Sequence, residues 1–134
     1  MEKMTLKNVL GNSGYGCWLL NYENIILDVN TALTGVLGYL PGQMVGKPTV
    51  DFLDAENTRL FIDKLYDLAP NQTAGFFMQM LAKNGDNIEV NVTGSVVTDN
   101  EGENLYYLCL IEDLAPIRTE KKRSYWFEEI KVNS

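Results

Sequence analysis

The residues that perform most nucleophilic and metal chemistry are scarce in this sequence. Histidine is absent, which removes the usual general base, the commonest metal ligand and the usual proximal ligand of haem. The two cysteines, Cys17 and Cys109, lie far apart inside apolar runs and lack the C-x-x-C spacing. We therefore interpret both as reduced, buried thiols that fill the core, and we expect no metal site.

Carboxylates are the remaining candidates for acid–base chemistry. If the protein were a small α+β enzyme with an open active-site cleft, its catalytic base would have to be Asp28, Asp51 or Asp54. No second catalytic group pairs with any of them in the sequence, and single acids at turns more often cap helices. We therefore expect that the protein is not an enzyme.

Length and charge limit the number of domains and the kinds of partner. The 134 residues, of which 46% are hydrophobic, suffice for a single domain with one core. The net charge is −7, although five of the eleven basic residues crowd into the last stretch: Arg118, Lys121, Lys122, Arg123 and Lys131. The rest of the surface is more acidic still and would repel a phosphate backbone, so we expect no nucleic-acid binding.

The hydropathy of the chain indicates where in the cell the protein is located. No apolar stretch approaches the ~20 residues that a membrane span requires, and the N-terminus lacks the apolar segment of a signal peptide. We expect a cytoplasmic domain, or the cytoplasmic portion of a membrane-bound sensor, in which this segment makes no membrane contact.

The first half of the chain predicts a hairpin followed by short helices. Two apolar, β-rich runs at residues 15–21 and 25–29 are spaced as a hairpin. Asn30 is placed to cap a helix that ends at Gly38. The apolar positions of that helix recur at helical spacing: Leu33, Val36 and Leu37.

Glycine and proline break up the residues that follow. They limit residues 42–45 to one turn of helix. Asp54 then precedes an amphipathic helix of about three turns, which Pro70 stops. The apolar stripe of this helix contains Leu60, Phe61, Leu65 and Leu68.

The second half predicts three strands and a last helix. The strands are expected at residues 74–82, 88–97 and 105–112, joined by turns at residues 84–85 and 100–102. Asp113 is placed to cap a helix that continues towards Ile130. The element order is therefore two strands, several short helices and three strands.

This order carries six short motifs that together resemble a PAS domain. In chain order they are Asn30-Thr31-Ala32-Leu33, Leu37-Gly38-Tyr39, Met44-Val45-Gly46-Lys47-Pro48, Lys83-Asn84-Gly85, Asp99-Asn100-Glu101-Gly102 and Ile111-Glu112-Asp113-Leu114-Ala115. The resemblance implies an α+β fold in which a five-stranded antiparallel sheet packs short helices on one face. It divides the chain into an N-terminal cap segment (1–11), the PAS domain (12–116) and a C-terminal linker helix (117–134) that leads to a missing output domain.

The resemblance also allows a test for cofactors. The reactive cysteine of the light-sensing flavin subgroup is missing, since Thr49 and Val50 stand nearest its place. The positions that hold the flavin ring edge by side-chain amides in that subgroup correspond to Met80, Val90 and Ile111, which are apolar and would leave flavin polar atoms unpaired. Haem in this family usually binds a histidine, and this sequence has none. A sulfur ligand would have to be Cys17, Cys109, Met78 or Met80, residue types that routinely fill cores. We therefore expect neither flavin nor haem, while a small apolar ligand remains possible.

Strand alternation predicts which residues face the helices. The candidate pocket lining comprises Leu33, Val36, Phe52, Phe61, Leu65, Met78, Met80, Val90, Cys109 and Ile111. This set either fills itself, which is usual for protein interiors, or holds a small apolar ligand.

The same alternation sends a second apolar set to the outer face of the sheet. Its members are Phe77, Leu81, Tyr106, Leu108 and Leu110. An apolar face of this kind needs cover, which a second copy of the chain, the N-terminal segment or the C-terminal helix would supply. We expect a homodimer through this face, as the resemblance also implies.

Two functions are compatible with these features. The resemblance implies a sensory and signal-relay module that dimerises and transmits a signal to an output domain, such as the histidine kinase of a two-component system. The alternative is a chemosensor whose apolar pocket binds a small metabolite, and it requires a real cavity.

Overall fold

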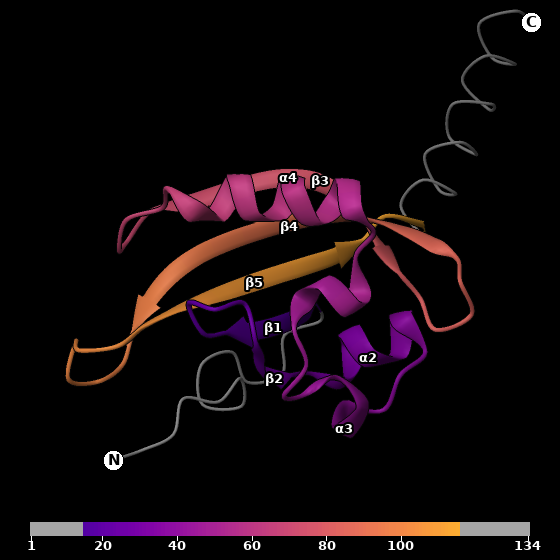
Figure 1. Cartoon of the computed structure of the whole chain (residues 1–134), viewed down its shortest axis with the longest axis horizontal. Helices are drawn as coiled ribbons and strands as arrows, with labels where there is room; N and C mark the ends of the chain where they lie inside the picture. The colour runs from indigo at the N-terminus through magenta and orange to yellow at the C-terminus, as the bar shows by residue number, and fades with distance from the viewer. Residues whose placement is uncertain (1–14, 116–134) are drawn as a thin grey trace, which may run out of the picture.

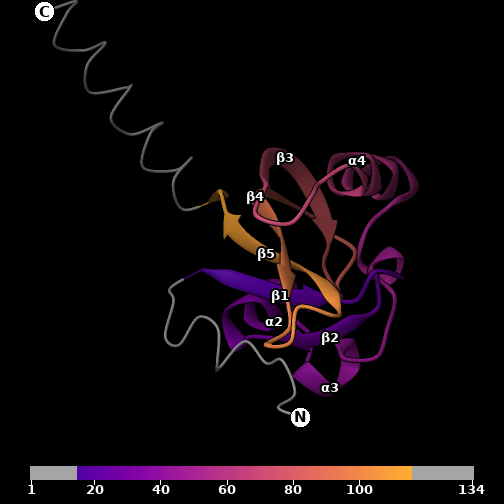
Figure 2. The same cartoon turned by 90° about the vertical axis from the view of Figure 1, so that its left-hand side faces the viewer.

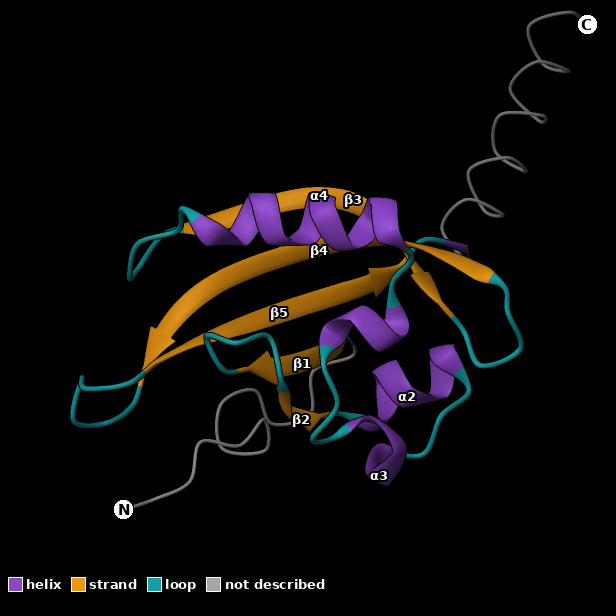
Figure 3. Cartoon of the chain, in the orientation of Figure 1, coloured by secondary structure: helices purple, strands orange, loops and turns teal. Residues whose placement is uncertain are grey.

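The computed structural model describes residues 15–115, which form five strands and four short helical segments (Figures 1 and 3). In chain order these are β1 (Gly16–Leu20), β2 (Ile26–Val29), α2 (Thr31–Leu37), α3 (Pro41–Met44), the 3₁₀ helix η1 (Thr49–Phe52), α4 (Ala55–Tyr66), β3 (Thr73–Leu81), β4 (Asn87–Thr98) and β5 (Leu105–Asp113). The predicted C-terminal helix, the N-terminal cap segment and the basic tail lie outside the described residues.

The five strands form one antiparallel sheet in the order β2-β1-β5-β4-β3. Helix α4 lies against the β3 side of the sheet, whereas α2 and α3 lie against β1 and β2 (Figures 1 and 2). This arrangement confirms the predicted α+β fold. The predicted strand limits agree with the observed ones to within one or two residues.

Local capping explains where the helices begin and end. Asp54 accepts hydrogen bonds through Oδ1 from the backbone N–H and the side-chain amide of Asn57, both at 2.8 Å. Gly38 ends α2 in the left-handed conformation (φ 83°), which favours glycine, and donates its N–H to the carbonyl of Thr34. The predicted stripe of the long helix extended to Leu68, but α4 ends at Tyr66, and Leu68 packs on the core from the loop that follows.

Asn30 caps α2 and also links this helix to β1. Its Oδ1 accepts from the N–H of Leu33 at 3.1 Å and from the N–H of Cys17 at 2.9 Å. Its Nδ2 donates to the carbonyl of Tyr15 at 2.7 Å. The side chain thus supports both a helix terminus and the start of β1, more than the simple cap that the sequence predicts.

We expect Asn30→Ala to lower the free energy of unfolding by about 2 kcal/mol. A lost N-cap alone costs about 1 kcal/mol, and the two bonds to β1 add to it. Urea denaturation followed by circular dichroism measures the change. Asn100→Ala, in the exposed turn before β5, is the control and should change stability by less than ~0.5 kcal/mol. A loss for Asn30→Ala no larger than the control's would contradict the linking role.

Candidate functional site

The inner face of the sheet is packed by large side chains. Of the ten predicted pocket residues, nine are buried in one continuous core and Val36 is partly buried against it. Phe61 is fully buried, with its ring centroid 5.6 Å from that of Trp18 and 6.1 Å from that of Phe76. Neither Trp18 nor Phe76 belongs to the predicted lining. Their rings occupy the space between α4 and the sheet.

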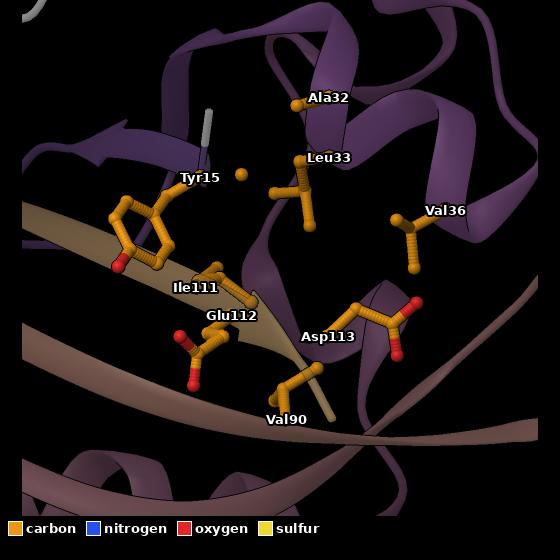
Figure 4. Close-up of a pocket in the computed structure, with 9 residues that line it drawn as sticks. Tyr15, Ala32, Leu33, Val36, Val90, Ile111, Glu112 and Asp113 are labelled. Atoms are coloured by element: carbon orange, nitrogen blue, oxygen red, sulfur yellow. The ribbon is translucent and has the colours of Figure 1, made fainter. Parts of the chain in front are cut away.

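A pocket of about 300 Å³ opens elsewhere, between α2 and the ends of β1 and β5 (Figure 4). Its lining comprises Tyr15, Gly16, Ala32, Leu33, Val36, Val90, Ile111, Glu112 and Asp113. Four of the predicted residues therefore meet at this pocket: Leu33, Val36, Val90 and Ile111. The six others do not line the pocket and lie within the core alone: Phe52, Phe61, Leu65, Met78, Met80 and Cys109.

The pocket lies where the end of β5 extends beyond the first residue of its antiparallel neighbour β1. Gly16 pairs with Ile111, and β5 then continues to Asp113, paired with β4. Gly16 also lets α2 approach the sheet, since a Cβ there would lie 3.1 Å from the Cβ of Leu33. The glycine in an otherwise apolar strand was a sequence signal of close approach, but the acids at the end of β5 gave no sign that they would border a cavity.

Polar side chains border this pocket on two sides, with Tyr15 and Glu112 on one side of Ile111 and Asp113 on the other (Figure 4). Oδ1 of Asp113 accepts from the backbone N–H of Ala115 at 3.0 Å, and the helix that Asp113 is predicted to cap lies outside the described residues. Glu112 and Tyr15 also line a second, smaller hollow of about 220 Å³. The remaining residues of that hollow are Asn91, Thr93 and Leu110.

Both cysteine thiols are buried, as the sequence predicts. Burial raises the pKa of Cys17 to about 11, with a further contribution from the charge of Asp28. Burial raises the pKa of Cys109 to about 12, and the indole of Trp18 acts in the opposite direction without reversing the shift. At neutral pH both side chains are protonated, and a protonated thiol is a poor nucleophile.

The carboxylates that are candidate bases lie on different elements of the fold. Asp28 accepts from the N–H of Val29 at 2.9 Å, and Asp54 is the N-cap of α4. Hydrogen bonds from Asn57 hold the pKa of Asp54 below its usual range. Within residues 15–115, no three side chains of the Cys, Asp and Glu types gather closely enough to hold a metal ion.

The outer face of the sheet carries a second apolar cluster, here called the outer patch. It consists of Cys17, Leu19, Val97, Tyr106, Leu108 and Leu110, on β1, β4 and β5. Three of the five predicted outward residues thus belong to it. The other two, Phe77 and Leu81, lie on β3, and Phe77 is 70% exposed. Asn91 and Thr93 of β4 lie between Phe77 and Leu110, because Phe77 pairs with Asn91 and Leu110 pairs with Thr93.

Comparison with known proteins identifies the class. The PAS domain family model matches residues 14–115. The chain therefore belongs to the PAS domain family, and the described part is a PAS sensory domain.

Solved structures agree with this assignment. The fold is similar to the PAS domain of an HTR-like protein from Haloarcula marismortui, at a TM-score of 0.66 and 19% identity over 81% of this chain and 88% of that one. It is also similar to the PAS domain of a protein from Colwellia psychrerythraea, at a TM-score of 0.67 and 17% identity over 75% and 86% of the two chains. A PAS domain from a two-component sensor histidine kinase matches at a TM-score of 0.59 and 15% identity, over 79% and 90%.

None of the helices within residues 15–115 combines the length and the apolar character that crossing a membrane requires.

Proposed function

We propose that this PAS domain is a cytoplasmic relay module that dimerises and passes a conformational signal to an output domain, such as a histidine kinase. The observation that carries the proposal is the pairing of the two ends of the domain. Gly16, at the start of β1, pairs with Ile111 near the end of β5. A shift of one strand end against the other is thereby transmitted directly to the chain that follows β5. The likeness to a PAS domain of a two-component sensor histidine kinase supports the kind of output.

Dimerisation in this proposal uses the outer patch. Tyr106, Leu108 and Leu110 are only half-buried in the single chain, although they are large apolar side chains. Burying a fully exposed side chain of this size contributes roughly 1.5–3 kcal/mol, and covering the part of each that is still exposed contributes a fraction of that, which favours association with a second copy. Phe77, although more exposed, stands apart on the edge strand and belongs to the rim of the contact.

Leu108→Glu tests the relay module, because it places a charge in the middle of the outer patch. We expect the wild-type chain to have the mass of a dimer by light scattering at ~100 μM, and the variant to have the mass of a monomer, because an unpaired charge is costly to bury. Leu40→Glu is the matched control, since Leu40 is 69% exposed in the helical layer, and it should remain dimeric.

Two further measurements keep this test decisive. Circular dichroism of Leu108→Glu separates loss of association from loss of folding. Tyr106→Lys, at the edge of the same patch, should also weaken the dimer. A monomeric wild-type chain, or a Leu108→Glu variant of unchanged mass, would rule out dimerisation through this face.

We further propose that the relay works without flavin or haem. The three positions that hold a flavin ring in the light-sensing subgroup, Met80, Val90 and Ile111, are apolar and buried here. Flavin amides and carbonyls placed against them would lose hydrogen bonds at about 1–3 kcal/mol each. An absorbance spectrum of the purified chain should therefore lack flavin and Soret bands. A stoichiometric band of either kind would contradict this proposal.

A second candidate function, a chemosensor for a small metabolite, is favoured by the pocket at the ends of β1 and β5. Its volume of about 300 Å³ is at the lower end of the range for small-molecule sites. It is not the self-filled interior between α4 and the sheet. A ligand here would touch both strand ends that the relay proposal couples.

A further inference from the structure

The pocket between α2 and the ends of β1 and β5 has walls of two chemical kinds. Its apolar wall is formed by Leu33, Val36, Val90 and Ile111. The carboxylates of Glu112 and Asp113 and the aromatic ring of Tyr15 complete the lining (Figure 4). Tyr15 and Glu112 lie together on one side of Ile111, whereas the carboxylate of Asp113 points to the other side, because consecutive residues of a strand face opposite ways. An apolar wall beside a ring and a carboxylate suits a molecule that is apolar at one end and positively charged at the other.

The net negative charge of the surrounding domain also favours a cationic ligand. Residues 15–115 contain fourteen acidic side chains and only four basic ones, Lys47, Arg59, Lys64 and Lys83. None of these four lines the pocket. A domain with this balance attracts small cations and repels small anions.

We propose that this pocket binds a small organic cation with an apolar body, of the alkylammonium or arylalkylammonium class. The apolar body lies against α2 and Ile111, and the ammonium group lies towards Glu112 and the ring of Tyr15. The inference rests on the second candidate function, ligand sensing, and names its ligand class. The volume of about 300 Å³ restricts the ligand to a small molecule.

The position of the pocket gives binding a consequence for the domain. Tyr15 immediately precedes β1, and Glu112 and Asp113 end β5. A bound cation therefore contacts residues at both strand ends and favours the conformations in which they lie close together. A ligand shifts such an equilibrium by its difference in affinity for the two states.

Three probes of similar size test the charge preference: 2-phenylethylammonium, the neutral 2-phenylethanol and the anionic 3-phenylpropionate. Each is titrated into the ¹⁵N-labelled full chain and followed by NMR. We expect the ammonium ion to shift the amide signals of Ala32, Val36 and Glu112, and to bind at least about fivefold more tightly than the alcohol. The carboxylate should bind more weakly than either.

Variants then assign the effect to this pocket. Glu112→Gln should weaken binding of the ammonium ion about 2- to 5-fold, as loss of one solvent-accessible ion pair does. Asp113→Asn should weaken binding less, because the carboxylate of Asp113 points away from Glu112 and Tyr15. Asp113→Asn retains an oxygen that can accept from the N–H of Ala115. Glu101→Gln, in the exposed turn before β5, is the matched control and should bind like the wild-type chain. Ala32→Phe should block the pocket and abolish the shifts.

Each outcome decides between the proposals. If the alcohol or the carboxylate binds here as tightly as the ammonium ion, or if neither acid variant weakens binding, the cation preference is overturned while ligand sensing stands. If none of the probes binds below ~10 mM, both are overturned. The relay function is measured separately by the mass of the dimer.

Discussion

Replacing Phe61 with alanine is expected to lower the free energy of unfolding by about 3–5 kcal/mol, the usual cost of removing a fully buried aromatic ring. Phe61 is completely inaccessible to solvent, and its ring contacts those of Trp18 on β1 and Phe76 on β3. Its removal leaves a cavity between α4 and both halves of the sheet, which the strands cannot close without losing their pairing. Chemical denaturation followed by circular dichroism measures the loss.

The neighbouring position on the same helix provides the control. Ile62 is 36% exposed, and Ile62→Ala should cost less than ~1 kcal/mol, because it leaves little buried space empty. Equal losses for the two variants would mean that α4 contributes helix propensity alone and does not pack through Phe61. The spacing of apolar residues also predicts that this face of the helix is buried.

Local chemistry made much of the fold predictable. Asn30 and Asp54 each lie directly before the helix that they cap, so their role depends only on residues within one helical turn. Both cap as expected. Alternation placed Val90 and Ile111 on the buried face correctly, because the period of a strand is two wherever it lies in the sheet. These features depend on neighbours in sequence and therefore can be predicted from one sequence.

The shape of the site depended on contacts between distant residues. The spacing of residues predicts that Phe61 faces the sheet, but not that Trp18 of β1 and Phe76 of β3 fill the space beside it. It also cannot predict that Gly16 pairs with Ile111, a register that leaves room at the end of β5. The candidate lining therefore mixed core residues with the four that meet at the pocket.

Gly94 on β4 is expected to be the most sensitive glycine in the sheet. It is buried on the inner face, and a Cβ built there would overlap Cδ2 of Leu65 on α4 and lie 3.8 Å from Sγ of Cys109. Leu65 is itself buried and cannot move into solvent. Gly94→Val should therefore lower the free energy of unfolding by about 3 kcal/mol, at the upper end of the usual cost of overpacking a core, as measured by urea denaturation.

Two comparisons establish that steric overlap is the cause. Gly75→Val on the neighbouring strand is the control, since a Cβ there meets nothing closer than the carbonyl oxygen of Val92 at 3.9 Å, and stability should change by less than ~1 kcal/mol. Leu65→Ala alone should cost about 2–5 kcal/mol because it leaves a cavity. In the double variant the valine of Gly94→Val occupies that cavity, so the double variant should lose clearly less than the two single losses added together. Strictly additive losses would show that Leu65 does not pack over Gly94, and that α4 rests on the sheet in another position.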